Sequence, residues 1–327
     1  MQSVPLWSHL EKKGKVSKDG GLYISRSWMR GAPSKGTGMF SGDEALDLTR
    51  YQRSQKYRVE THRVVIPCSI PKKELNINQG KSAAVRLIEE YPKTDLEAAA
   101  LDINSFMLSG ISTGLVFPSA ELYGFSCLNG QFTSGRGVGL DSGLLEFAAP
   151  NTQTQVTQDI AKSEANYHYN QYQDITAFAT DGMRRLRQVY RACAHYAGKP
   201  GGGPDLIIMD DATFGNFQLE KQDLVRVQVV GSNLDKGNLV QDVLGVGGVY
   251  SDPTIDIAND FTGVAADGVT YMLNTDFFEL VLFEKFSFGK FEEPIGSQDA
   301  IVAKAAMQGN LICRKFPAQG CVSGGSV

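Results

Sequence analysis

Residues 174–217, which decide the fold, read DITAFATDGMRRLRQVYRACAHYAGKPGGGPDLIIMDDATFGNF. Apolar residues in the first half recur at the i, i+3, i+4, i+7 spacing of one helical face. They are Ile175, Phe178, Ala179, Gly182, Leu186, Val189, Tyr190, Cys193 and Ala197. The opposite face is basic, and we expect it to be solvated or to meet acidic partners. It carries Arg184, Arg185, Arg187, Gln188 and Arg191.

The second half of this stretch predicts a reversal, a strand and a helix. Gly198 should end the first helix, since glycine adopts the left-handed cap conformation without a Cβ clash. Residues 199–204 are glycine and proline apart from one lysine, so they favour a turn. Residues 206–209 are all apolar, as in a strand buried on both faces. Asp210 or Asp211 is a suitable N-cap for a short helix over 212–220, and this order of elements predicts an α/β domain.

This order of features resembles the axial domain of the major capsid proteins of tailed phages, which have the Hong Kong phage coat fold. The shared features are an Asn-x-Tyr motif, the arginine-rich helix, the Gly/Pro turn, Pro-Asp-Leu-Ile-Ile and Asp-Asp-Ala-Thr-Phe. The resemblance implies an α+β fold with four parts. They are an N-terminal arm, an extended β-hairpin loop, a peripheral domain with a spine helix, and an axial α/β domain.

The composition of the 327 residues is that of a folded protein with many turns. Hydrophobic residues make up 42% and charged residues 21%, and there are 35 glycines. No apolar run approaches the roughly 18–20 residues that a membrane-spanning helix needs. The five cysteines form no CxxC pair, so we expect neither structural disulfides nor a zinc site.

Charge is distributed unevenly along the chain. Residues 1–73 hold 14 Lys/Arg against 6 Asp/Glu, whereas the remaining 254 residues hold 18 against 30. A basic N-terminal section could bind nucleic acid or lie across the acidic body of a neighbouring copy. No basic patch interleaved with aromatic residues supports nucleic-acid binding, so we favour contact with another copy.

The first seventy residues or so have few apolar residues, and we expect them to gain structure on another copy. Residues 1–45 are rich in glycine and should form an arm ordered by neighbours. Residues 56–66 alternate without an apolar face, which predicts a strand that is wet on both sides. The resemblance makes this strand part of the extended loop that overlaps the next subunit; an ordinary surface hairpin is the alternative.

Two helices and several strands complete the pattern. Residues 81–91 have helical spacing, and Pro92 should stop or kink that helix. Thr94 to Glu97 read as a capping box for a second helix, which the resemblance identifies as the spine helix. Residues 270–273, 278–283 and 303–313 should be strands, and the resemblance implies that the C-terminal strands return to the peripheral sheet.

Signatures of catalysis or metal binding are weak in this sequence. The glycine-rich residues 135–143 loosely resemble a phosphate-binding loop but lack the Gly-Lys-Ser/Thr ending, so we interpret them as a flexible loop. Asp252, Asp256 and Asp260 could share a helix face and bind a hard cation, although Pro253 favours a solvated loop. His195 should be a surface residue and Cys193 an inert core thiol. We therefore expect no enzyme, no cofactor and no metal.

The resemblance also gives domain boundaries. Residues 1–40 would be the arm, 41–70 the extended loop, 71–130 with 265–327 the peripheral domain, and 131–264 the axial domain. Four basic residues of the loop are expected to contact acidic residues of the next subunit. The basic residues are Arg53, Lys56, Arg58 and Arg63, and the acidic residues are Glu89, Glu90 and Asp95.

The implied function is structural. Copies of the chain would form hexamers and pentamers that close into an icosahedral shell around double-stranded DNA, held without sequence-specific binding. Further expected partners are scaffolding, portal and decoration proteins, and no membrane is involved. The shell would be assembled in the bacterial host cytoplasm and become the virion capsid. Alternatives are an encapsulin-like compartment of the same fold, or a nucleotide-binding enzyme using residues 135–143.

Overall fold

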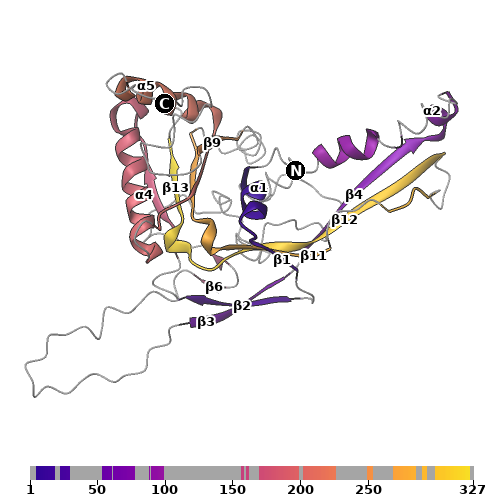
Figure 1. The fold of residues 1–327 in the computed structure, drawn as a ribbon, viewed down its shortest axis with the longest axis horizontal. Coiled ribbons are helices and arrows are strands. Elements are labelled where there is room, and N and C mark those ends of the chain that lie inside the picture. The colour runs from indigo at the N-terminus through magenta and orange to yellow at the C-terminus, as the bar shows by residue number, and fades with distance from the viewer. Residues whose placement is uncertain are drawn as a thin grey trace, which may run out of the picture.

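The computed structural model describes about half of the chain (Figure 1). The described residues are 5–18, 23–29, 54–60, 62–77, 88, 90–98, 156–157, 160–161, 169–198, 202–225, 249–252, 268–284, 289–292 and 299–324. In this part of the chain, no helix is both long and apolar enough to span a bilayer.

Two β-sheets organise the described structure, and both are mixed parallel and antiparallel. The five-stranded sheet has the order β7 (Gln171–Asp174), β13 (Gly320–Ser323), β10 (Thr270–Leu273), β8 (Leu206–Met209), β9 (Val249–Ser251). The four-stranded sheet has the order β1 (Val16–Lys18), β11 (Phe278–Glu284), β12 (Ala300–Cys313), β4 (His62–Pro71). Two further pairs are β2 (Tyr23–Met29) with β3 (Ser54–Glu60), and β5 (Val156–Thr157) with β6 (Ile160–Ala161).

The inner strands of the five-stranded sheet are buried on both faces, as β8 shows. All four residues of β8 are buried, as their unbroken apolar run predicted. Leu206 and Ile208 contribute to one hydrophobic core, whereas Ile207 and Met209 contribute to the other. This division follows from the alternation of side chains along a strand. The second core is covered by α4 (Met183–Ala197) and α5 (Asp211–Val225).

Local sequence signals fix the ends of these two helices. A π-helical turn, η2 (Phe178–Gly182), leads into α4, and Gly198 ends it with a left-handed φ of 74°. Asp210 precedes α5, and its Oδ2 accepts a hydrogen bond from the Thr213 amide at 3.2 Å. The predicted end of the first helix is confirmed, and of the two possible N-caps the structure uses Asp210.

The first core lies between the two sheets and includes the N-terminal helix α1 (Pro5–Lys12). Leu6 and Leu10 are completely buried there, and Trp7 is 4% exposed. The expectation that the first 45 residues gain order only on another copy is therefore wrong for residues 5–18. Their apolar side chains are spaced so that one face of a short helix enters the chain's own core.

Two pairs of consecutive strands run from one sheet into the other. β10 continues through the turn η4 (Thr275–Phe277) into β11, and β12 continues through η5 (Phe316–Ala318) into β13. β10 pairs with β13 and β11 pairs with β12, so the two crossings lie side by side (Figure 1). The three predicted C-terminal strands are confirmed. The C-terminal strands are divided between the sheets: β11 and β12 lie in the four-stranded sheet, whereas β10 and β13 lie in the five-stranded sheet.

The expected single strand over residues 56–66 is divided between two sheets. β3 pairs with β2 in a two-stranded ribbon, whereas β4 pairs with β12 from His62–Gly309 to Pro71–Ala300. The ribbon therefore joins residues 23–29, expected in the arm, to residues 54–60, expected in the extended loop. The strand β4 also has an apolar face, because Cys68 and Ile70 are buried.

Residues 90–98 are helical through Pro92, so the expected break at Pro92 is wrong. Residue 88 is helical as well, so the preference of the residue before a proline for extended backbone is overridden here. The capping box is also wrong: the Thr94 hydroxyl donates to the Glu90 carbonyl at 3.2 Å, within the helix. Tyr91 donates to Glu74 of α2 (Lys72–Ile77) at 2.7 Å.

The docking of α1 can be tested by removing one buried side chain. Leu10→Ala should lower the free energy of unfolding of the subunit by about 3 kcal/mol, through lost burial and the cavity left behind. Urea denaturation followed by circular dichroism measures this. Glu11→Ala, at the exposed neighbouring position, is the control and should change stability by less than about 0.5 kcal/mol. An equally small effect of both substitutions would show that α1 does not pack on its own chain.

Candidate functional site

The seven residues expected at the subunit interface are only partly described. Arg53 and Glu89 lie outside the described residues. Arg58 lies on β3 and Arg63 on β4, and Lys56 of β3 is exposed. Glu90 is exposed and Asp95 half-buried on the helix over residues 90–98. One subunit cannot bring the basic and acidic groups of two copies together, so their pairing remains a prediction.

Asp95 has a contact within its own chain. It lies beside Cys68 of β4; burial and then the hydrogen bond to Asp95 raise the pKa of the Cys68 thiol to about 12. This contact places the helix over residues 90–98 against the four-stranded sheet.

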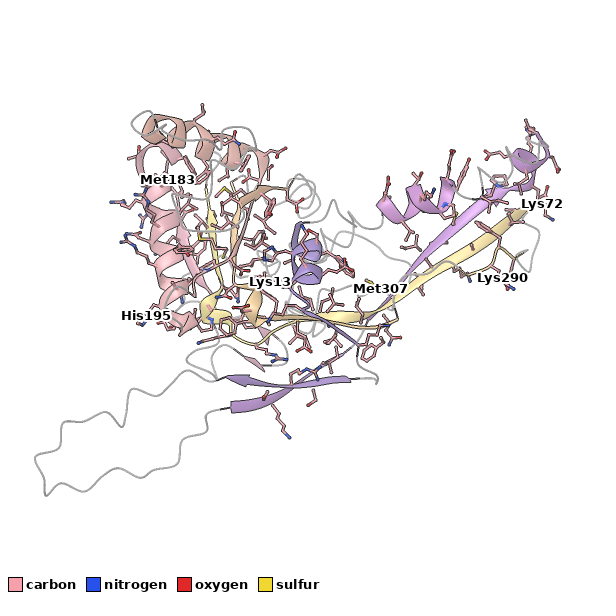
Figure 2. The ribbon with its side chains drawn as sticks, in the orientation of Figure 1. Lys13, Lys72, Met183, His195, Lys290 and Met307 are labelled. Carbon is pink, nitrogen blue, oxygen red and sulfur yellow. The ribbon has the colours of Figure 1, made fainter. Side chains whose placement is uncertain are left out.

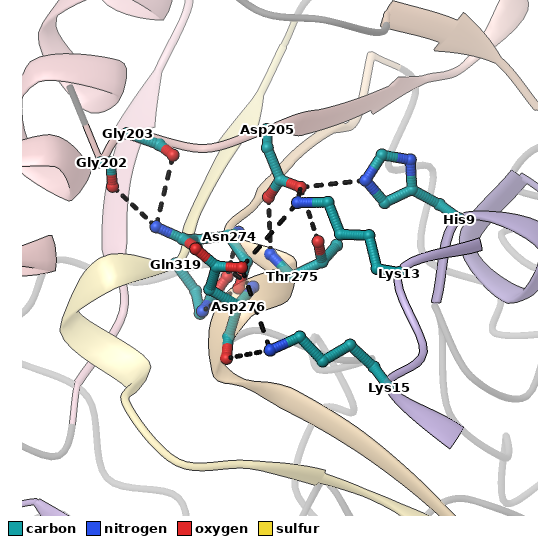
Figure 3. A network of polar contacts seen from close by, with 10 residues as sticks. All are labelled: His9, Lys13, Lys15, Gly202, Gly203, Asp205, Asn274, Thr275, Asp276 and Gln319. Carbon is teal, nitrogen blue, oxygen red and sulfur yellow. Dashed lines mark hydrogen bonds and ion pairs between the residues drawn. The ribbon is translucent and has the colours of Figure 1, made fainter. Parts of the chain in front are cut away.

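A buried polar network lies at η4 and η5, where the chain crosses twice between the two sheets (Figure 3). The Asn274 amide donates to Gln319 Oε1 at 2.7 Å, and Gln319 Nε2 donates to the Asn274 carbonyl at 3.2 Å. The Asn274 side chain donates to the carbonyl of Gly202 at 2.7 Å. Gln319 is completely buried and Asn274 is 3% exposed. Since unpaired buried amides are costly, these bonds favour one geometry for both crossings.

Asp205 attaches the N-terminal segment to this network. Its carboxylate accepts hydrogen bonds from the Thr275 amide at 2.6 Å and the Thr275 hydroxyl at 2.5 Å. It also accepts one from His9 Nε2 at 2.9 Å and pairs with Lys13 (Figure 3). Although burial opposes ionisation, these donors lower the pKa of Asp205 well below its ordinary range. Lys15 donates to the Asp276 carbonyl at 3.2 Å, next to Thr275.

Glu279 forms a second polar centre, which we call the ribbon anchor together with Ser17, Arg26 and Arg314. Phe278 and Leu280 point into the first core, so alternation places Glu279 on the other face of β11. Arg26 of β2 binds the carboxylate in a bidentate manner, at 3.0 Å from Nη2 and 3.3 Å from Nε.

Two further donors complete the ribbon anchor. The Ser17 hydroxyl donates to Glu279 at 2.8 Å, and Arg314 pairs with the same carboxylate. Burial opposes ionisation, but the donors prevail, led by Arg26, and lower the pKa of Glu279 to about 2. The anchor thus holds the β2–β3 ribbon against the four-stranded sheet (Figure 1).

Cys193 and His195 behave as the sequence predicted. Cys193 is completely buried, and burial raises the pKa of its thiol far above the ordinary range. Burial likewise raises the pKa of Cys313 to about 12, so neither is a thiolate nucleophile at neutral pH. His195 is exposed on α4 and points away from the sheet (Figure 2). Asp252 is buried rather than solvated, whereas Asp256, Asp260 and residues 135–143 lie outside the described residues.

Sequence reasoning missed most members of these two networks. His9 and Asp205 are 196 residues apart, and Arg26 and Glu279 are 253 apart, so no local spacing relates them. The Asn-Thr-Asp sequence at 274–276 is typical of a turn, but the pairing of Asn274 with Gln319 depends on tertiary structure. The polar networks around Asp205 and Glu279 can hold separate segments of the chain at fixed angles to one another.

The ribbon anchor predicts a pH dependence of stability. The folded-state pKa of Glu279 is below its ordinary value of 4.5, so the carboxylate stabilises the fold fully above that pH. The contribution is lost as the pH falls from about 4.5 towards 2. Glu279→Gln should cost about 2 kcal/mol at pH 7 and much less near pH 3, measured by urea denaturation. Glu292→Gln, at an exposed position, is the control. An equal loss for Glu279→Gln at both pH values would contradict the ion pairing.

Comparison with known proteins gives matches in structure but none in sequence. No protein-family model and no curated protein matches the sequence. The chain is similar to one from the capsid of an empty GTA particle, with 12% identity, a TM-score of 0.53, and 96% of this chain and 95% of that one covered.

Two further structures are similar to the same extent. For the cyanophage A-1(L) capsid, identity is 13%, the TM-score 0.52, and 94% of this chain and 89% of that one are covered. For Mycobacterium phage Bobi, identity is 12%, the TM-score 0.52, and the covered shares are 94% and 87%. The chain therefore has the fold of the tailed-phage major capsid proteins, as the resemblance in sequence predicted.

Proposed function

We propose that this chain is the major capsid protein of a tailed double-stranded DNA bacteriophage. Its copies assemble into hexamers and pentamers, which close into an icosahedral shell around the genome. The observation that supports this most strongly is the fold, which matches a GTA capsid chain over 96% of this chain and 95% of the other. The role is structural and non-enzymatic, and its place is the virion capsid.

The shape of the subunit supports assembly. β4 and β12 form a long two-stranded projection, with Lys72 and Lys290 at its far end and Met307 near the body (Figure 2). A two-stranded pair is marginally stable on its own. On β4 and the helical segments that follow it in sequence, three apolar side chains are exposed: Val65 of β4 by 38%, Ile77 of α2 by 71% and Ile88 by 37%. Contact with neighbouring copies would cover them, and many modest contacts add up in a closed shell.

The two sheets correspond to the two bodies of the proposed subunit. We assign the axial role to the five-stranded sheet with α4 and α5, and the peripheral role to the four-stranded sheet with the helix over residues 90–98. The β2–β3 ribbon begins the extended loop, which overlaps the next subunit. The proposed boundaries differ from those expected from sequence, because β10 and β13 join the axial body and β2 joins the loop.

The partners follow from this role. The main partner is the chain itself, and scaffolding, portal and decoration proteins join the particle during assembly in the bacterial cytoplasm. The acidic balance of residues 74–327 suggests that the shell encloses DNA without binding it tightly.

Electron microscopy of the purified chain tests the proposed function. We expect negatively stained samples to show closed icosahedral shells, or rings of five and six subunits, because obligate interfaces of this kind bury more than about 2,000 Å². Sedimentation velocity gives the size distribution in solution. A chain that remains monomeric at all concentrations and salt conditions would contradict the proposal.

The basic residues of the extended loop give a second prediction. Replacing Arg53, Lys56, Arg58 and Arg63 together with glutamate should prevent shell formation and leave the subunit folded, because the loop would repel the acidic surface of the next copy. Microscopy shows whether shells form, and circular dichroism shows whether the subunit is folded. A variant with lysine at the three arginine positions keeps the charge and should still assemble. Normal shells from the glutamate variant would show that these residues make no such contact.

A further inference from the structure

Helix α4 has an outward face with three arginines and no acidic residue. Arg184, Arg187 and Arg191 are exposed, and nitrogen-tipped side chains project from this side of the helix between Met183 and His195 (Figure 2). The fourth arginine, Arg185, pairs with Asp181 at 3.1 Å. Among the described residues, the other three form neither ion pairs nor side-chain hydrogen bonds. We call these three residues the arginine stripe.

The arginine stripe borders a hollow of about 590 Å³ in the surface. The π-helical turn η2 and the start of α4 contribute an apolar part, which includes Ala179 and Met183. α5 contributes Glu220, the one carboxylate among the lining residues that the structure describes. Three arginines against one glutamate leave the hollow with two net positive charges. It therefore combines apolar surface with unbalanced positive charge.

Packing of the π-helical turn forms this hollow in the isolated subunit. The Phe178 ring lies against Gly182, where a Cβ atom would approach the ring to within 2.7 Å. Asp181 is 7% exposed and holds Arg185 away from the stripe. Single π-helical turns within helices occur frequently at functional sites. A partner would therefore meet a surface that needs little rearrangement.

The arginine stripe is unfavourable in the isolated subunit. Arg184 and Arg187 are three residues apart, and Arg187 and Arg191 are four apart, so like charges are neighbours on the helix. Like-charged pairs at this spacing destabilise a helix. Next to the carboxylates of an acidic partner, the same arginines are stabilising, because attraction to the partner outweighs their mutual repulsion. We propose that the hollow and the arginine stripe bind an acidic surface of a second copy of this chain, an inference that rests on the proposed function.

A second copy fits this surface better than DNA does. Residues 74–327 hold 30 Asp/Glu against 18 Lys/Arg, so another copy offers the complementary charge. The apolar part of the hollow can accommodate protein side chains, whereas phosphates would leave it unfilled. The arginine stripe carries one sign of charge, so it does not complement itself and needs a different, acidic patch of the other copy. A contact between two different patches can be repeated head to tail, and such contacts close into rings when the rotation fits.

Substitutions that reverse the charge, conserve it or fill the hollow test this contact. R184E/R187E/R191E should reduce the amount of rings and shells at a fixed subunit concentration by roughly tenfold or more. R184K/R187K/R191K keeps the charge and should assemble like the wild type. A179W fills the hollow without changing charge and should also reduce assembly. Sedimentation velocity and negative-stain microscopy measure the particles, and circular dichroism confirms that each variant is folded.

The outcomes separate this inference from the proposed function. Wild-type yields of rings from the glutamate variant overturn the inference and leave the capsid proposal intact. Normal shells that hold less DNA also overturn it, in favour of nucleic acid as the ligand. If the wild type forms open filaments in place of rings or shells, the capsid proposal fails; loss of those filaments in the glutamate variant still supports the contact. A wild type that remains monomeric overturns both.

Discussion

The hydrogen bonds between Asn274 and Gln319 fix the two positions at which the chain passes from one sheet to the other, from β10 to β11 and from β12 to β13. Both residues are buried, so their amide groups must be paired within the protein. The pairing is reciprocal, because each residue both donates to and accepts from the other. The bend at η4 and the bend at η5 are thus coupled, and the angle between the two sheets depends on this contact.

The extended parts of the subunit are attached close to these bends. Asp205 and Thr275 connect α1 to the first bend, and Glu279, four residues beyond Thr275, connects the β2–β3 ribbon to β11. Carboxylates suit this role, since each can accept several hydrogen bonds from different segments. In a subunit that assembles, the direction of each extension decides which neighbour it reaches. We therefore regard the polar networks as determinants of assembly geometry, in keeping with the proposed function.

Some expectations failed for identifiable physical reasons. Residues 5–12 were expected to belong to an arm ordered by neighbouring copies, but three apolar side chains are enough to order them when a core between two sheets accepts them. Pro92 was expected to end a helix, but the extended preference that a proline imposes on the residue before it is only a local bias, and residues 90–98 are helical despite it. Residues 56–66 were expected to form one strand because they alternate, yet alternation does not show which partner strand each half will pair with. For the predicted subunit interface, the structure of one subunit gives the positions of the described residues but not the residues that they contact in a neighbouring copy.

The sequence alone determined the α4–turn–β8–α5 unit, because its helical spacing, glycine cap, apolar run and capping aspartate are all local signals. It also determined the burial of Cys193 and the exposure of the basic face of α4. Tertiary structure alone decided the attachment of α1, the crossing of β10 and β12 between sheets, and the carboxylate networks of Asp205 and Glu279. The contacts of α1 and of the ribbon join residues 196 and 253 positions apart, and the contact at the crossings joins residues 45 apart. Such contacts are settled by how the sheets pack, which no local pattern records.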